Sequence, residues 1–179
     1  MNIIKVLKND KINRWNGLTR NEAYNLEKEC LICINNNFEC LCKIKQNHFP
    51  KLIDFDDEKY QFVLSNCGIC IKEYNKSKKK NIIIANKKEQ VNCIIENLKK
   101  MNIIHLDMST NGKNMCITED GIISIIDFDI AIINNNSLSE QITKLYNQYT
   151  IKDNYYDNIR KKILKIVNKS IKKIAAEIR

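Results

Sequence analysis

The chain has 179 residues and a net charge of +9, from 30 Lys and Arg against 21 Asp and Glu. Its hydrophobic content of 44% suffices for a packed core and argues against a chain that is disordered throughout. The sequence has no run of about 18 apolar residues, which argues against a transmembrane helix. The N-terminal MNIIKVLKND also lacks the pattern of a signal peptide. We therefore expect a cytoplasmic protein with one domain over 1–179 and no membrane partner.

The positive charge raises the question of a nucleic-acid partner, because clustered Lys and Arg bind phosphate backbones. The chain is rich in Asn, Ile and Lys, the residues of AT-rich codons. Its Lys residues are scattered, apart from Lys76–Lys80 and the C-terminal segment. Part of the charge is therefore explained by coding bias. A basic nucleic-acid-binding protein is kept as an alternative that the sequence does not favour.

The N-terminal third of the chain predicts a strand, a helix and a hairpin. Residues 2–8 (NIIKVLK) have the composition of a strand. Residues 19–22 (TRNE) match a capping box, and apolar residues then follow at helical spacing. Residues 38–44 are expected to add a short turn of helix. Residues 51–55 and 60–65 flank an acidic turn and predict a β-hairpin.

The rest of the chain predicts mostly helix, interrupted by a second pair of strands. Residues 87–101 carry their apolar side chains on one side, which is typical of an amphipathic helix. Residues 114–131 read as two short strands around an Asp-Gly turn. Two further helices are expected over 137–149 and 154–178. The pattern as a whole predicts an α+β fold.

The eight cysteines have to be explained without a signal peptide, which favours free thiols over disulfides. The pairs Cys30/Cys33 and Cys67/Cys70 have CxxC spacing, and Cys40 and Cys42 lie between them. This pattern keeps a zinc site open as an alternative. Against zinc, the first pair lies on the apolar side of the predicted helix, where a thiol packs as a small hydrophobic group. The nearby His48 is interpreted as structural.

A cluster of acidic and amide residues follows position 104. His105-Leu106-Asp107 precedes Asn114, and the second predicted strand ends in Asp127-Phe128-Asp129. The stretch IIHLDMSTNGKNMCITEDGIISIIDFD resembles the catalytic core of the protein-kinase-like superfamily, which has H-x-D, an Asn, two strands around a turn, and D-F-G or a variant. The resemblance implies a two-lobe fold, with a truncated N-lobe and hinge over 1–68 and a minimal helical C-lobe over 69–179.

The chemistry of phosphoryl transfer suits these residue types. A carboxylate orients the acceptor hydroxyl, and oxygen ligands hold the Mg²⁺ that contacts the phosphates. The resemblance implies that Asp107 is the catalytic residue and that Asn114 and Asp127 are Mg²⁺ ligands. It further implies that Lys5 binds the ATP phosphates and that Glu22 is its partner.

The stretch YQFVLSNCG over 60–68 resembles the fifth strand and the hinge of the same superfamily. The resemblance implies that the backbone of Ser65, Asn66 and Cys67 contacts adenine. We therefore expect ATP and Mg²⁺ as cofactors, and transfer of the γ-phosphoryl group of ATP to a hydroxyl. A protein Ser or Thr is the favoured acceptor. A small-molecule hydroxyl and a protein partner stay open.

Several positions depart from the family pattern. None of the four glycines precedes Lys5, so the glycine-rich loop over the phosphates has no counterpart. The spacing from the catalytic Asp to the Asn (114 − 107 = 7) is longer than in H-R-D-x-x-x-x-N, which makes Asn111 a rival metal ligand. Leu106 and Asp129 replace the Arg of the loop and the Gly of D-F-G. These departures keep a pseudokinase, which binds nucleotide without turnover, open as an alternative.

Overall fold

The computed structural model describes residues 2–7, 18–77, 82–108, 111–133 and 154–177. In these residues the protein is mixed α and β, with small sheets. In chain order the elements are β1 (Asn2–Val6), α1 (Arg20–Asn37), β2 (Leu52–Asp56), β3 (Gln61–Ser65), β4 (Ile69–Cys70), α2 (Ile71–Ser77), α3 (Lys87–Lys100), β5 (Ile103–His105), β6 (Met115–Ile117), β7 (Ile123–Ile125), β8 (Ala131–Ile133) and α5 (Tyr155–Glu177).

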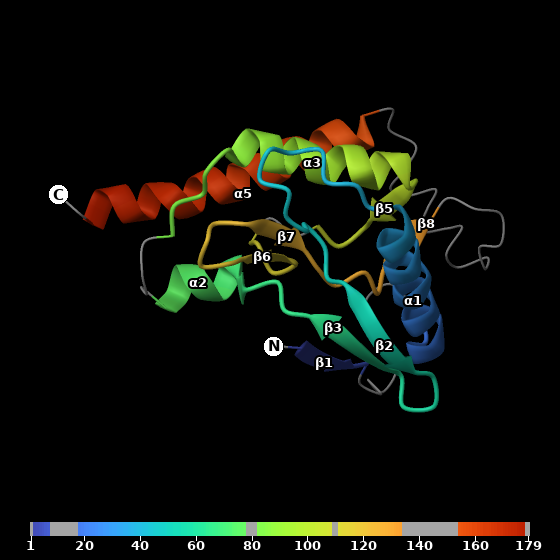
Figure 1. Cartoon of the computed structure of the whole chain (residues 1–179). Helices are drawn as coiled ribbons and strands as arrows, with labels where there is room; N and C mark the ends of the chain where they lie inside the picture. Colours follow the sequence, from blue (N-terminus) through green and yellow to red (C-terminus); the bar gives the residue numbers. More distant parts are fainter. Residues whose placement is uncertain (1, 8–17, 78–81, 109–110, 134–153, 178–179) are drawn as a thin grey trace.

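The first sheet is built from β1, β3 and β2, in that order, and both pairs are antiparallel. The predicted hairpin forms its β2 and β3, and the predicted N-terminal strand forms β1. Helix α1 lies alongside this sheet (Figure 1) and stacks the ring of Tyr24 on that of Phe62, with centroids 4.6 Å apart. The stacking fixes the helix against the strand that carries the hinge sequence.

Helix α1 begins with the predicted capping box. The side chain of Thr19 accepts a hydrogen bond from the backbone N–H of Glu22, and the Glu22 carboxylate accepts one from the N–H of Thr19. Two otherwise unpaired backbone groups are thereby satisfied. The buried face of the helix consists of Ala23, Tyr24, Leu26, Glu27, Cys30, Leu31 and Ile34. One residue of this otherwise apolar face, Glu27, carries a carboxylate, and its ion-pair partner belongs to the candidate functional site.

The other strands form two small sheets, with the orders β4-β6-β7 and β5-β8. Figure 1 shows α3 and α5 packed together on one side of the β6–β7 hairpin. The buried amide of Gln90 on α3 donates to the carbonyls of Ala85 and Gly121 and accepts from the N–H of Ile123. The amide therefore connects α3 to the segment just before it and to the turn that leads into β7.

A continuous buried cluster extends from the first sheet, through α1 and the β6–β7 hairpin, to α3 and α5. The predicted helices over 87–101 and 154–178 are confirmed as α3 and α5. The expected helical turn over 38–44 is wrong, because this segment is an irregular loop packed against α3. Helix α2 was not predicted, and the predicted helix over 137–149 lies outside the described residues.

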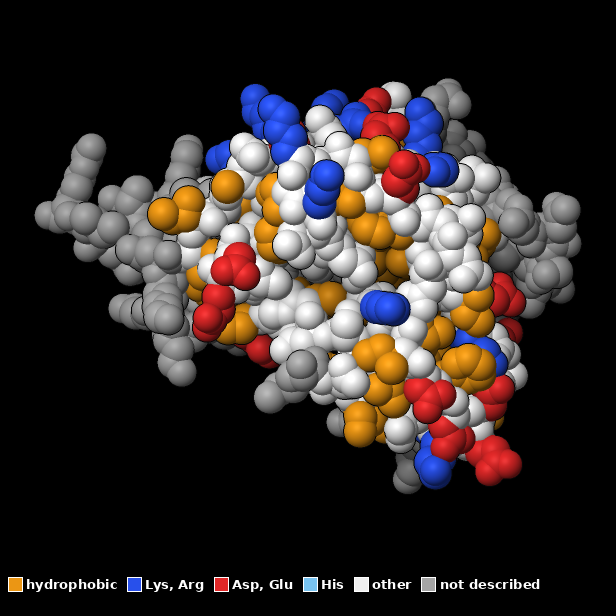
Figure 2. Space-filling view, in the orientation of Figure 1, with side chains coloured by type: hydrophobic (Ala, Val, Ile, Leu, Met, Phe, Trp, Pro, Cys, Tyr) orange, Lys and Arg blue, Asp and Glu red, His pale blue; other side chains and the backbone are white. Residues whose placement is uncertain are grey.

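The surface carries charges of both signs (Figure 2). Lys and Arg side chains gather along the α3 side in this view, and acidic side chains lie among them and at the β2–β3 turn. The exposed lysines of α3 are Lys88, Lys99 and Lys100. None of the described helices has the length and apolar character needed to span a membrane.

Candidate functional site

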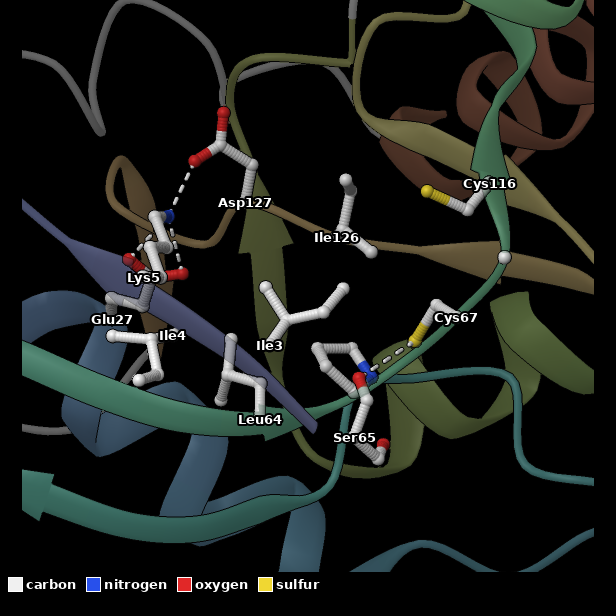
Figure 3. Close-up of a pocket in the computed structure, with 12 residues that line it drawn as sticks. Ile3, Ile4, Lys5, Glu27, Leu64, Ser65, Cys67, Cys116, Ile126 and Asp127 are labelled. Carbon is white, nitrogen blue, oxygen red and sulfur yellow. Dashed lines mark hydrogen bonds and ion pairs between the residues drawn. The ribbon is translucent and has the colours of Figure 1, made fainter. Parts of the chain in front are cut away.

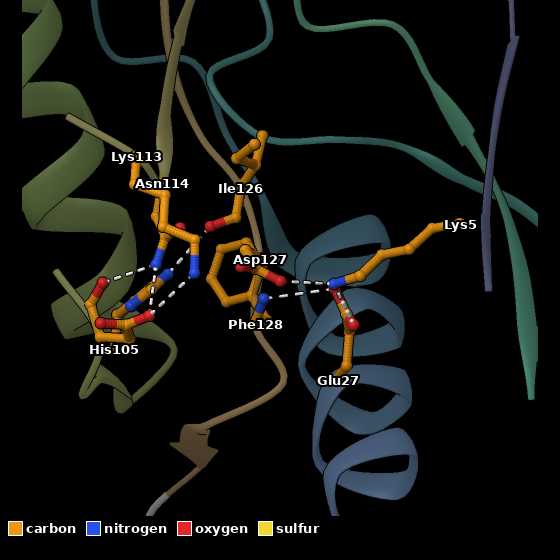
Figure 4. Close-up of polar contacts among 9 residues, drawn as sticks. Lys5, Glu27, His105, Lys113, Asn114, Ile126, Asp127 and Phe128 are labelled. Atoms are coloured by element: carbon orange, nitrogen blue, oxygen red, sulfur yellow. Dashed lines mark hydrogen bonds and ion pairs between the residues drawn. The ribbon is translucent and has the colours of Figure 1, made fainter. Parts of the chain in front are cut away.

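An ion-pair cluster joins three segments that are distant in the sequence. The Nζ atom of Lys5 on β1 lies 2.7 and 2.6 Å from the two carboxylate oxygens of Glu27 on α1. The same atom lies 2.6 Å from Oδ1 of Asp127, which follows β7 (Figure 4). Glu27 is 1% exposed, and its Oε1 also accepts a hydrogen bond of 3.2 Å from the backbone N–H of Phe128. One carboxylate thus holds both Lys5 and the Asp-Phe-Asp segment.

Burial and ion pairing act in opposite directions on the pKa values of this cluster. Burial alone would lower the pKa of Lys5, but attraction to Glu27 and Asp127 raises it overall. Burial raises the pKa of Glu27, with Lys5 opposing the change. Burial also disfavours ionised Asp127, yet Lys5 holds the pKa of that carboxyl below its ordinary value. Two carboxylates facing one ammonium leave an excess of negative charge, which a divalent cation would offset.

The prediction that Glu22 is the partner of Lys5 is wrong. Glu22 lies at the exposed start of α1, where its carboxylate binds the backbone N–H and the hydroxyl of Thr19. Glu27 is the partner of Lys5 instead. It lies more than a helical turn after Glu22 and on the buried face of α1. An acidic residue within the apolar stripe, between Ala23 and Cys30, was the signal that could have identified it.

Asp127 lies at a strained point of the backbone. Its φ is 70°, in the left-handed region that non-glycine residues seldom adopt. The residue comes two positions after the end of β7, next to Ile126, whose N–H donates to the carbonyl of Asn114 over 3.1 Å. Asp127 therefore follows directly on a residue paired with Asn114. Strain of this kind is concentrated at functional sites.

Asn114 and Asp107 form a second polar pair on the other side of this position. The Nδ2 atom of Asn114 donates to the backbone carbonyl of Asp107 over 2.6 Å and to its Oδ2 over 3.0 Å. Both partners can only accept, so the amide oxygen Oδ1 must face away from them. That oxygen is buried and has no hydrogen-bond partner in the described part of the chain. Lys113 adds a positive charge, with Nζ 4.0 Å from Oδ2 of Asp107.

His105 supports the loop that follows β7 through a hydrogen bond and a ring contact. The imidazole is fully buried, and its Nε2 donates to the carbonyl of Ile126 over 3.0 Å. The ring packs on that of Phe128, with centroids 5.1 Å apart. The hydroxyl of Tyr155 on α5 donates to the backbone carbonyl of His105 over 2.8 Å. Burial lowers the pKa of His105, which favours a neutral structural group over a titrating one.

A cavity of about 240 Å³ opens beside the ion-pair cluster. Lys5, Glu27 and Asp127 lie at one end, and Ser65 and Cys67 lie at the other (Figure 3). Gly68 also lines the cavity. The remaining lining is mostly apolar and consists of Ile3, Ile4, Pro50, Leu64, Cys116 and Ile126. This combination, an apolar space with a few polar groups at its ends, is typical of a small-molecule site.

The predicted hinge residues divide between this cavity and the surface. Ser65 and Cys67 line the cavity, whereas Asn66 is exposed, and its Oδ1 accepts a hydrogen bond from the backbone N–H of Gly68 over 2.8 Å. Burial raises the pKa of Cys67 to about 11, so its side chain lies in the cavity wall as a neutral thiol. The structure thus brings two of the three predicted residues to the cavity.

The residues present fit a Mg²⁺ ion. Magnesium prefers oxygen ligands from carboxylates and amides, and Asp127 together with the unpartnered Oδ1 of Asn114 offers both. Asn111, the rival ligand, is exposed and accepts a hydrogen bond from the backbone N–H of Lys113 over 2.9 Å. We therefore retain Asn114 over Asn111 as the candidate ligand.

Comparison with known proteins gives the chain no family by sequence: no family model matches it, and no curated protein is similar to it. The kinase-like interpretation therefore depends on the residues and on the geometry described above.

Proposed function

We propose that this chain is an ATP-dependent phosphotransferase of the protein-kinase-like superfamily, which transfers the γ-phosphoryl group of ATP to a hydroxyl. The observation that carries the proposal is the meeting of Lys5, Glu27 and Asp127 at one end of a mostly apolar cavity. Such a cavity suits a nucleobase, and a cluster of one ammonium and two carboxylates suits a metal–phosphate group.

Each polar residue has a role in this proposal. Lys5 binds the phosphates, and Glu27 keeps its ammonium group in position. Asp127 and Oδ1 of Asn114 would hold Mg²⁺, which offsets the charge that develops on the transferred group. Asp107 orients the acceptor hydroxyl and takes its proton as the new oxygen–phosphorus bond forms and ADP departs.

In this proposal the protein has two lobes. The sheet β1-β3-β2 and α1 would form a small N-lobe, and α3, α5 and the β6–β7 hairpin would form the C-lobe. The cavity with Ser65 and Cys67 at its edge would take the adenine. We propose a protein Ser or Thr as the acceptor, with a small-molecule hydroxyl as the alternative.

The test is an ATP titration with Mg²⁺, followed by thermal stabilisation of the protein and by ADP release with casein as the hydroxyl acceptor. Wild type should bind ATP and release ADP. Asp107→Asn keeps the size of the side chain and should keep binding while losing turnover by about a hundredfold or more. Absence of ATP binding by the wild-type protein, with or without Mg²⁺, would sink the proposal.

One observation favours a nucleotide-binding module without turnover as the second candidate. The direct contact between Lys5 Nζ and Asp127 Oδ1 engages a carboxylate oxygen that a metal ion would otherwise use. In that case the titration gives Mg²⁺-independent ATP binding, and neither wild type nor Asp107→Asn releases ADP.

A further inference from the structure

We propose that Cys40, Cys42, His48 and Cys93 bind a structural zinc ion. Their candidate ligand atoms, three Sγ atoms and one ring nitrogen, all lie within 4.8 Å of one another. The set matches the Cys₃His composition of structural zinc sites. It shares no residue with the cavity or with the ion-pair cluster.

The distances inside this Cys₃His cluster suit one tetrahedral ion. The Sγ atom of Cys42 lies 3.3 Å from Sγ of Cys40 and 3.2 Å from Nε2 of His48. Two sulfurs bound to one zinc at about 2.3 Å would lie about 3.8 Å apart in a tetrahedron. An outward shift of a few tenths of an ångström would therefore make room for the ion.

The imidazole of His48 is already oriented as a ligand. Its Nδ1 lies 2.7 Å from the backbone carbonyl of Ile123, which can only accept a hydrogen bond, so Nδ1 must donate. In the neutral ring the lone pair is then on Nε2, the atom that faces Cys42. A second hydrogen bond from a ligating histidine to a carbonyl is the usual outer support of a zinc site. His48 is also fully buried.

The fourth ligand, Cys93, lies on α3. The site therefore requires the loop over 38–48 to be held against this helix. Asn97 on α3 does this by accepting from the N–H of Glu39 over 3.1 Å and donating to its carbonyl over 2.8 Å. The backbone N–H of Leu41 then donates to Sγ of Cys93 over 3.3 Å. An N–H donor of this kind would stabilise a zinc-bound thiolate.

The CxxC pairs that suggested zinc in the sequence do not form this cluster. The thiol of Cys30 donates to the carbonyl of Ala131, and that of Cys70 donates to the carbonyl of Lys113. Among the described residues, the Cys₃His cluster is the metal-ligating group of three or more that the structure offers. Four protein ligands, largely buried, leave no open position, so the ion would be structural and not catalytic.

The measurement that decides the proposal uses the full-length wild-type chain, purified under reducing conditions without chelators. Elemental analysis should find about one zinc per chain. Titration of the metal-free, reduced protein with Co²⁺ should give the intense visible absorption of tetrahedral cobalt and the near-ultraviolet band of thiolate ligation. Zinc below about a tenth of an equivalent together with no cobalt spectrum would overturn the proposal. A disulfide between Cys40 and Cys42 in the purified protein would overturn it as well.

Variants then assign the ligands. Cys93→Ser and His48→Gln should each lose most of the bound zinc and weaken the cobalt spectrum. Cys116→Ser is the matched control, because this cysteine is equally buried but lies outside the Cys₃His cluster. It should keep a full equivalent of zinc. Unchanged zinc in both ligand variants would place the metal elsewhere and overturn the assignment. None of these measurements depends on ATP, so the result is independent of the proposed phosphotransferase.

Discussion

The ammonium group of Lys5 lies 2.6 Å from the carboxylate of Asp127, although 122 residues separate the two in the chain. Glu27 binds the same ammonium from α1 and is almost completely excluded from solvent. Three segments therefore have to be in place before this ion-pair cluster exists.

Glu27→Gln should weaken ATP binding by about tenfold, which corresponds to about 1.4 kcal/mol. The amide replaces a charged acceptor by a neutral one, so Lys5 loses one of its two carboxylate partners. Calorimetric titration with ATP and Mg²⁺ measures the change.

Glu22→Ala is the matched control on the same helix. It removes one half of the capping box and should lower the free energy of unfolding by about 1 kcal/mol without changing ATP affinity. If Glu22→Ala weakened ATP binding as much as Glu27→Gln, the assignment of Glu27 as the partner of Lys5 would be wrong.

Asn114→Ala should raise the Mg²⁺ concentration needed for half-maximal ATP binding by about tenfold or more, because one oxygen ligand is lost. Asn111→Ala should leave the Mg²⁺ requirement unchanged, because its side chain binds the backbone of its own turn. Titration of Mg²⁺ at fixed ATP distinguishes the two. The reverse order of effects would make Asn111 the ligand.

Gln90→Leu should lower the free energy of unfolding by about 3 kcal/mol. The substitution leaves the buried carbonyl of Gly121 and the buried N–H of Ile123 without their partner, where the chain enters β7, and also removes the hydrogen bond to the carbonyl of Ala85. Urea denaturation measures the loss. Asn92→Leu, on the exposed side of the same helix, should stay within about 0.5 kcal/mol of wild type. Equal effects of the two would contradict the connecting role of Gln90.

Gly68→Ala should destabilise the protein by about 2 kcal/mol and weaken ATP binding with it. Gly68 has a φ of +94°, and a Cβ atom there would collide with the backbone of Ile117. Since Gly68 also lines the cavity, relief of the collision would move the segment over 65–68 that borders it. Thermal unfolding and ATP titration of this variant are both informative, and wild-type values in both would contradict the strain.

Local patterns were enough to predict most of the regular structure. The capping box located the start of α1, the acidic turn located the β2–β3 hairpin, and the apolar spacing located α3 and α5. Asp107 and Asn114 were singled out by the kinase-like resemblance, and the structure adds a contact between them that joins residues seven positions apart. These features depend on interactions between residues that are near in sequence.

Features that depend on distant packing were missed. Glu27 was passed over because a carboxylate within an apolar stripe is understood only once its partner, 22 positions earlier, is known. The Cys₃His cluster combines three residues of one loop with Cys93, on a helix far along the chain. CxxC spacing pointed instead to two pairs that do not come together, in which Cys30, Cys67 and Cys70 bind backbone carbonyls. The hydrophobic periodicity of a single element does not indicate which loop packs on which helix.

The backbone of His48 has a further consequence for the proposed active site. Its carbonyl accepts a hydrogen bond from Ile125, and its ring binds the carbonyl of Ile123, so the two contacts cover the length of β7. Asp127 lies two positions after the end of that strand. If the zinc proposal holds, the supply of zinc in the cell would set the fraction of chains in which β7 is correctly aligned. A shortage of zinc would then also weaken the proposed binding of Mg²⁺ at Asp127.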